Sequence, residues 1–159
     1  MKNLMDRLPR EVIFFHIIPY TYNIQSKSLL EDIVSYTNAK NLLTELYYNF
    51  WILFAEDTEP EDKNWLLNDI YTYANEDNAT MNGYVENFYN IYRRHVMLDT
   101  KEKIDRYILK LRERMDVRKQ INIFMGLLSA KERNEFIENR KSFYHKTVLS
   151  YTNQNDMNE

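Results

Sequence analysis

The sequence predicts an all-α fold, a single-domain bundle of about six or seven helices. Only 2 of its 159 residues are glycine and 3 are proline, so the chain holds few of the residues that interrupt helices. Apolar residues recur at helical spacing, and helix-start signals recur between them. We expect a first helical segment over residues 1–55, a bundle continuous with it over 56–151, and a flexible polar tail over 152–159.

Helix starts are indicated by capping boxes, in which a Ser, Thr or Asp is followed three residues later by Glu. Each side chain of such a box accepts a hydrogen bond from a free backbone N–H of the other residue. The four candidate boxes are Ser28 with Glu31, Thr58 with Glu61, Asp99 with Glu102 and Ser129 with Glu132. Pro60 falls in the first turn of the helix that Thr58 is expected to begin, where its missing N–H costs nothing.

The first predicted helix begins near Pro9, and its apolar run from Val12 to Ile18 is interrupted only by His16. A helix that is apolar on nearly every side must be covered all round. Because a small domain has little surface for that purpose, we expect a helical protein partner to cover the outer side. The residues expected to contact this partner are Leu8, Pro9, Ile13, Ile17 and Ile18.

A core helix is predicted over residues 38–55, because its apolar side chains fall within one sector of the helix. That sector holds Leu42, Leu43, Leu46, Tyr47, Phe50, Leu53 and Phe54. Tyr48 and Ile52 fall outside it, and Trp51 lies at its edge. These three are expected either to be buried on a second side by another helix or to form a ridge that binds a partner, which makes Tyr48 and Trp51 candidate binding residues.

Three further apolar patterns predict the helices that follow. A largely aromatic stripe predicts a core helix over 84–96: Tyr84, Val85, Phe88, Tyr89, Tyr92 and Val96. A narrow seam between alternating charges predicts an outer helix over 101–115: Ile104, Ile108, Leu111 and Met115. The apolar face then continues to the break at Ser129: Val117, Ile121, Phe124 and Leu128.

The last predicted helix carries an apolar face of Phe136, Ile137, Phe143, Tyr144 and Val148. Arg140 lies in the middle of this face. A guanidinium there is expected to pair with an acid from another helix or to extend to solvent, and the functional alternative is that it binds an acidic partner group. Arg140 is therefore a third candidate binding residue.

Charge is divided unevenly along a chain whose formal net charge is −3. Residues 1–92 hold 6 Lys and Arg against 14 Asp and Glu, whereas residues 93–159 hold 15 against 10. The two halves are expected to attract each other within the molecule or to bind different partners. The overall charge gives no general attraction to nucleic acid or to membranes.

The residues that most enzymes and metalloproteins need are missing. With no cysteine and two glycines, the chain has no thiolate zinc site, disulfide framework or glycine-rich phosphate loop. His16, His95 and His145 are far apart and lack any two-ligand spacing, and no serine has the glycine neighbour of a nucleophile turn. We therefore expect a protein that is not an enzyme and that uses no cofactor or metal.

Targeting signals are also absent from the printed sequence. No apolar run reaches the roughly 20 residues that span a bilayer. The run near the amino terminus is bracketed by charge and proline, with no small-residue cleavage site after it. We expect an intracellular protein without a membrane span.

One pattern resembles a known family. Leu8 and Pro9, the acid Glu11, and the apolar pairs Ile17–Ile18 and Leu29–Leu30 resemble the start of an F-box, over about residues 6–50. This resemblance implies a three-helix N-terminal part that docks on the helical adaptor subunit of a cullin-RING ubiquitin ligase. With "IIPYTYNIQSKSLLEDI" at its centre, the segment is similar to the F-box-like N-termini of small proteins of nucleocytoplasmic large DNA viruses, and the 13 tyrosines and 18 asparagines agree with an AT-rich genome. A viral origin implies the host cytoplasm or the virion as its location.

These observations favour a non-catalytic adaptor for protein–protein interaction that docks a helical partner through its N-terminal segment. The alternative is a structural protein of a virion or other large assembly, in which the acidic half of one copy meets the basic half of the next. A nucleic-acid binder is a third possibility, and its salt-sensitive contacts would come from Arg93, Arg94, Arg112, Arg114, Arg118 and Lys119.

Overall fold

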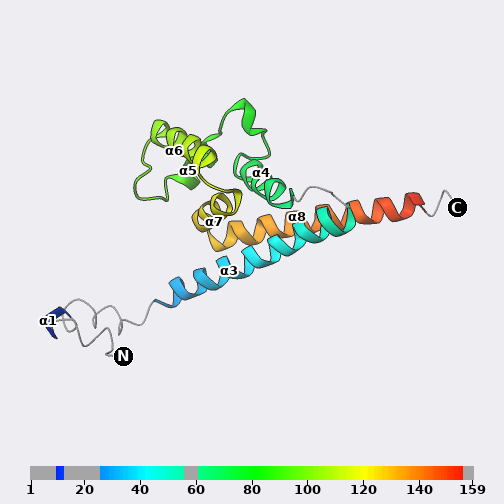
Figure 1. Ribbon diagram of the computed structural model, residues 1–159, viewed down its shortest axis with the longest axis horizontal. Helices are drawn as coiled ribbons and strands as arrows, with labels where there is room; N and C mark the ends of the chain where they lie inside the picture. The colour runs from blue at the N-terminus through cyan, green and yellow to red at the C-terminus, as the bar shows by residue number, and fades with distance from the viewer. Residues whose placement is uncertain (1–9, 13–25, 56–60, 156–159) are drawn as a thin grey trace. The chain divides into compact units, whose positions relative to one another are not determined.

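The computed structural model describes residues 10–12, 26–55 and 61–155, and every regular element among them is a helix (Figure 1). The elements are α1 (Arg10–Val12), α3 (Lys27–Tyr48), the π-helix η3 (Asn49–Phe54), α4 (Asp62–Ala74), the 3-10 helix η4 (Thr80–Asn82), α5 (Glu86–Tyr92), α6 (Lys101–Arg114), α7 (Val117–Leu127) and α8 (Ala130–Asn155). The predicted all-α fold is confirmed. None of the described helices is both long enough and apolar enough to cross a membrane.

The chain divides into two compact units, Met1–Ile33 and Val34–Glu159. The first unit contributes α1 and the first turns of α3, and the second holds all the later helices. The predicted boundary at residue 55 lies inside the second unit, directly after η3. At the other end, α8 continues past Tyr151 to Asn155, since neither glycine nor proline follows to interrupt it.

One capping box is confirmed in full. The backbone N–H of Ser129 donates to Glu132 Oε2 at 2.7 Å, and the N–H of Glu132 donates to Ser129 Oγ at 3.3 Å, just before α8 begins. The prediction for Ser28 is wrong, because α3 starts at Lys27 and Ser26 Oγ accepts from the N–H of Leu29. The hydroxyl of Ser26, two residues before Ser28, therefore occupies the cap position.

The other two boxes are also displaced. At α6 the cap is Thr100, whose side chain accepts from Lys103 N, while the neighbouring Asp99 forms an ion pair with Lys103 Nζ at 2.6 Å. The α4 helix begins at Asp62, with Glu61 as its cap residue, and thus later than the Thr58 box predicts. Thr58 and Pro60 themselves lie outside the described residues.

Aromatic rings form the centre of the second unit where α4, α5 and α7 pack together. The rings of Tyr71, Phe88, Tyr92 and Phe124 lie with their centroids 5.1 to 5.7 Å apart in successive pairs. Against this group packs α6, which buries the predicted seam of Ile104, Ile108 and Leu111. The predictions of an aromatic core helix and of an outer helix are confirmed for these residues.

Two long helices of the second unit lie side by side and run in the same direction: α8 and the part of α3 from Val34 onward (Figure 1). Arg133 Nε donates to Ser35 Oγ at 3.2 Å near one end, and the rings of Tyr47 and Tyr144 meet edge to face near the other end. The carboxyl-terminal ends of both helices therefore meet at the same end of the pair, beside α4.

Arg133 is fully buried and closes the end of α7. Its Nη1 donates to the carbonyl oxygens of Met125 at 3.1 Å and Leu128 at 2.6 Å, in addition to the bond to Ser35. The last carbonyls of a helix have no partner within the helix, so a buried helix end needs such donors. This role is not indicated by the sequence pattern.

A buried asparagine, Asn75, organises the connection between α4 and α5. Its Nδ2 donates to the carbonyl oxygens of Asn78 and Gly83, and its Oδ1 accepts from the N–H of Val85 at 2.7 Å. These bonds replace the partners that the backbone of an irregular segment would otherwise find in water. The polar segment over 75–85 is thus held from within by one side chain.

Some residues predicted to be buried are exposed. Val96 is 95% exposed because α5 ends at Tyr92, before the end of the predicted stripe. Leu53 and Phe54 are exposed because η3 is a π-helix, in which the α-helical spacing of side chains no longer applies. Met115 is exposed because its backbone is extended at the end of α6, and Leu42 is exposed at the margin of the predicted sector.

Ion pairs join the acidic and the basic halves of the chain inside the molecule. Glu86 contacts Arg93 at 2.6 Å and Lys101 at 2.8 Å, and Asp69 contacts Arg140 at 3.2 Å. The hydrogen bonds from Lys101 and Arg93 lower the pKa of Glu86 to about 2. The attraction between the halves is therefore satisfied at least in part within one molecule.

Candidate functional site

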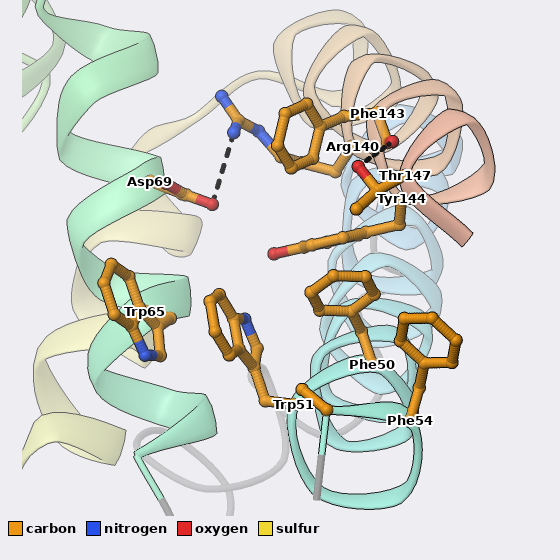
Figure 2. A pocket seen from close by; sticks show the side chains of 10 residues that line it. Phe50, Trp51, Phe54, Trp65, Asp69, Arg140, Phe143, Tyr144 and Thr147 are labelled. Carbon is orange, nitrogen blue, oxygen red and sulfur yellow. Dashed lines mark hydrogen bonds and ion pairs between the residues drawn. The ribbon is translucent and has the colours of Figure 1, made fainter. Parts of the chain in front are cut away.

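A pocket of about 700 Å³ opens between η3, α4 and α8 (Figure 2). We call it the aromatic cleft, because six of its ten lining residues are Phe, Trp or Tyr. Five of these six lie on η3 and α8, and the sixth, Trp65, lies on α4. The lining residues are Phe50, Trp51, Phe54, Ala55, Trp65, Asp69, Arg140, Phe143, Tyr144 and Thr147. All of them belong to the second unit.

Helical spacing places the α4 and α8 residues on the cleft. On α8, Arg140, Phe143, Tyr144 and Thr147 stand at positions i, i+3, i+4 and i+7, which share one face of a helix. On α4, Trp65 and Asp69 stand at positions i and i+4. Each of these two helices therefore presents one continuous side to the cleft.

The third wall depends on the π-helix. The N–H of Ala55 donates to the carbonyl oxygen of Phe50, five residues earlier, at 2.8 Å. This wider turn brings the rings of Phe50 and Phe54 to a centroid distance of 5.6 Å and leaves Trp51 beside α4. Single turns of π-helix occur frequently at functional sites, where they redirect side chains.

The aromatic rings pack against one another along the walls. The indoles of Trp51 and Trp65 are stacked, with centroids 4.7 Å apart and planes within 7°. On the opposite side, the rings of Phe50 and Tyr144 lie 4.2 Å apart. Since rings that hold one another lose little further freedom on binding, these walls are preorganised for an apolar ligand.

A charged pair closes one end of the cleft. Arg140 Nη1 lies 3.2 Å from Asp69 Oδ2, and the hydroxyl of Tyr47 donates to the same oxygen at 2.6 Å. The side chains of Arg140 and Asp69 are only 17% and 21% exposed. The prediction that Arg140 pairs with an acid from another helix is confirmed.

The two phenols near this pair are donors at neutral pH. Burial raises the pKa of Tyr47 far above its usual range, and the adjacent Asp69 carboxylate raises it further. Burial also raises the pKa of Tyr144. Neither phenol can serve as a base near pH 7.

One buried N–H group of the cleft residues, the Nε of Arg140, has no acceptor among the described residues. The indole N–H of Trp51 is turned toward the hydroxyl of Tyr144 (Figure 2). A buried donor that lacks a partner costs on the order of 1–3 kcal/mol, so such groups are rare in folded proteins.

The rim of the cleft is apolar and open to solvent. Phe143 is 55% exposed, and Phe54 and Trp65 are also exposed, so Phe143 does not belong to the core as the sequence predicts. On this face of α8, Tyr144 is buried, whereas Phe143, three residues after Arg140, is exposed on the cleft side. A second, almost wholly apolar hollow adjoins the cleft and shares Phe50, Phe54 and Tyr144 with it.

Of the predicted binding residues, the structure brings Trp51 and Arg140 together in the aromatic cleft. Tyr48 is exposed at the end of α3 and lines a separate hollow, together with Lys63 and Arg118. The remaining predicted residues lie outside the described part of the chain: Leu8, Pro9, Ile13, Ile17 and Ile18.

The sequence pattern does not single out Trp65 and Asp69, and it places Phe143 on the core face of the last helix. The i, i+4 spacing of Trp65 and Asp69 places them on one helix face, which is the part of their arrangement that the sequence indicates. No local signal places Trp65 against Trp51, since that contact joins residues on two separate helices.

The cationic residues considered for nucleic acid are mostly engaged within the molecule. Arg93 contacts Glu86, Arg94 contacts Glu132, Arg112 donates to the Tyr84 hydroxyl, and Lys119 contacts Asp116. Within the described residues, no group of three or more His, Asp or Glu is placed to hold a metal ion.

Known proteins supply no template for this cleft. Comparisons of the chain with protein-family models, curated proteins and solved structures found no match. The F-box-like and viral character of the N-terminal segment therefore stays a prediction from its sequence. The function of the cleft has to be inferred from the residues that line it.

Proposed function

We propose that this protein is a non-catalytic adaptor that binds a segment of a protein partner in the aromatic cleft. The observation that carries the proposal is an exposed ring of Phe54, Trp65 and Phe143 around a preformed hollow. The residues that dominate binding at protein interfaces are enriched in Trp, Tyr and Arg, and they lie in well-packed pockets surrounded by less critical contacts. Trp51, Tyr144 and Arg140 are of these residue types and line the cleft inside the exposed ring.

We further propose, from the sequence alone, that the N-terminal segment is a second docking surface. Its residues Leu8, Pro9, Ile13, Ile17 and Ile18 would face a helical partner, which for an F-box-like protein is the adaptor subunit of a ubiquitin ligase. On the same basis we propose a viral origin and a location in the host cytoplasm or the virion. One chain would then join two proteins through surfaces at different places in its sequence.

The ion pairs favour this adaptor role over association of the acidic half of one copy with the basic half of the next. Asp69 and Glu86 from the acidic half already contact Arg140, Arg93 and Lys101 from the basic half. A charge that is paired within its own molecule gains little by binding the same kind of charge on another copy.

The test uses peptides selected from a random library displayed on phage, with the full chain as the target. Phe143→Asp places a charge on the cleft rim, and Leu109→Asp is the matched control, because Leu109 on α6 is exposed to nearly the same fraction, 57% against 55%. Losing burial of one phenyl ring costs about 1.5–3 kcal/mol, so we expect Phe143→Asp to weaken selected peptides by about 10- to 100-fold.

The control should bind the same peptides within about twofold of the unmodified chain. Equal binding by both variants would place the peptide site elsewhere, and a library that yields no binder would remove the proposal for the cleft. Leu8→Asp tests the second surface separately, by co-purification with a recombinant ubiquitin-ligase adaptor subunit.

A further inference from the structure

We propose that a second hollow, between α3, α4 and α7, binds a nucleotide, with Lys40 and Arg118 contacting its terminal phosphate and the ring of Tyr48 stacking on its base. This α3–α7 hollow has a volume of about 640 Å³, and its walls also include Lys63 on α4. It shares no lining residue with the aromatic cleft, so the inference goes beyond the proposed function and does not depend on it.

Helical spacing brings polar side chains from two helices to the hollow. On α3, Lys40, Thr44 and Tyr48 stand at positions i, i+4 and i+8, which share one face. On α7, Arg118 and Asn122 stand at positions i and i+4. The buried apolar residues that also line the hollow are Leu66 and Ile121. An apolar base with a few convergent polar groups is typical of sites for small molecules.

The order of the helices along α3 gives the hollow two different ends. Arg133 joins the end of α7 to Ser35, early in α3, whereas α4 contacts α3 through the hydroxyl of Tyr47. In Figure 1, α7 accordingly lies beside an earlier part of α3 than α4 does. Lys40 therefore lies on the part of the α3 wall that α7 faces, and Tyr48 lies on the part that α4 faces.

The charges of the hollow leave two cations free at the α7 end. Asp62 Oδ2 lies 3.2 Å from Lys63 Nζ, and the Asp62 side chain is only 3% exposed, so these two charges cancel. Lys40 and Arg118 form no ion pair with any residue that the structure describes. A phosphate monoester carries a charge of about −1.5 to −2 near pH 7, whereas each phosphate within a nucleic-acid chain carries a single charge. Two free cations therefore match a terminal phosphate, to which a guanidinium can donate two parallel hydrogen bonds.

The other end of the α3 wall suits an aromatic base. Tyr48 is 46% exposed and lies eight residues after Lys40, about 12 Å further along the helix axis. Bases of nucleotides stack on exposed aromatic side chains of this kind. Glu45, three residues before Tyr48, also lines the hollow, and its carboxylate can accept a hydrogen bond from an amino group of the base or from a sugar hydroxyl.

The separation of the two ends favours a nucleotide over a shorter phosphate ester. In a phosphotyrosine side chain the phosphate is bonded directly to the ring. A nucleotide has a sugar between its phosphate and its base, so the phosphate can reach Lys40 while the base lies on Tyr48.

The experiment titrates the full chain with adenosine monophosphate (AMP) at low ionic strength and follows the backbone amide signals in ¹H–¹⁵N correlation spectra. Adenosine lacks the phosphate, and ribose 5-phosphate lacks the base. The dinucleotide ApA has bases and a phosphodiester but no terminal phosphate. These three compounds are the matched controls.

We expect AMP to bind with a Kd of about 0.1–1 mM, as a small ligand of this size allows. The amide signals that move should be those of residues lining the α3–α7 hollow, such as Thr44, Tyr48 and Asn122. Each control compound should bind at least about fivefold more weakly, because it lacks one of the matched groups. Added salt should weaken the binding of AMP, since salt screens exposed charges.

Two variants assign the two ends of the ligand. Arg118→Gln should weaken AMP by about 5- to 30-fold and change adenosine by less than twofold. Tyr48→Leu should weaken AMP and adenosine by about 5- to 30-fold and leave ribose 5-phosphate unchanged. Arg106→Gln, on the exposed side of α6, is the matched control for the lost charge and should bind AMP within about twofold of the unmodified chain. All three side chains are exposed, so the variants should fold, and the comparison of ligands on the unmodified chain needs no variant.

Four results would overturn the inference. AMP that moves none of the lining residues would remove the site. Equal weakening by Arg118→Gln and Arg106→Gln would reduce the binding to general attraction between charges. Equal binding of ribose 5-phosphate and AMP, unchanged in Tyr48→Leu, would remove the base from the ligand. ApA bound as tightly as AMP would identify a nucleic-acid chain in place of a nucleotide with a terminal phosphate. None of these results affects the aromatic cleft, whose peptides are tested with Phe143→Asp.

Discussion

Replacing Arg133 by methionine removes at least three hydrogen bonds from the interior of the second unit while keeping an unbranched side chain of similar length. The carbonyls of Met125 and Leu128 lose the guanidinium that lies 3.1 and 2.6 Å away, and Ser35 loses its partner at 3.2 Å. Each buried carbonyl left without a donor costs about 1–3 kcal/mol. Removing the buried charge offsets part of this loss, because a buried guanidinium carries its own desolvation cost.

The net expectation is a loss of about 2–4 kcal/mol in the free energy of unfolding. For a chain of this length, that loss lowers the melting temperature by roughly 5–15 °C. Urea denaturation followed by the helical circular dichroism signal measures it directly. The control is Arg114→Met at the exposed end of α6, which should change stability by less than about 0.5 kcal/mol. A loss below 1 kcal/mol for Arg133→Met would refute the capping role.

Three further changes test other parts of the fold. The hydrogen bond from Arg94, followed by those from Ser129, lowers the pKa of Glu132 from 4.5 to about 2, so its stabilisation is present above pH 4.5 and is lost as the pH falls through 2. Glu132→Gln should cost about 1–2 kcal/mol at pH 7 after screening, and should flatten the decline between pH 5 and pH 2 in urea titrations. Asn75→Ala should lower the free energy of unfolding by about 2–4 kcal/mol in thermal melts. Ser26→Ala should cost about 1 kcal/mol and Ser28→Ala less than about 0.5, by the same measurement.

Local signals in the sequence identify much of the helical fold. The seam of Ile104, Ile108 and Leu111 is buried as its spacing predicts, and the Ser129–Glu132 box begins α8. Arg140 pairs with an acid from another helix, since an apolar helix face leaves a charged side chain few other choices. The seam and the capping box are readable because their residues lie within one or two turns of each other, whereas the partner of Arg140 on another helix is not identified by its own stretch of sequence.

The aromatic cleft could not be predicted in this way. The sequence indicates Trp51 and Arg140 as candidates, but their meeting depends on α4, which supplies Trp65 and Asp69 from a separate stretch of chain. The π-helix could not be predicted either. A spacing of 100° per residue holds for an α-helix, and the turns of η3 are wider. Arg133 gave no signal, since its described partners include two backbone carbonyls and a serine hydroxyl, which no sequence pattern marks.

The measurement that bears most directly on the adaptor proposal is a set of intermolecular nuclear Overhauser effects between a display-selected peptide and the full chain. A peptide that binds in the aromatic cleft should show contacts to the rings of Trp51 and Tyr144. Contacts confined to other surfaces, such as the exposed side of α6 around Leu109, would contradict it.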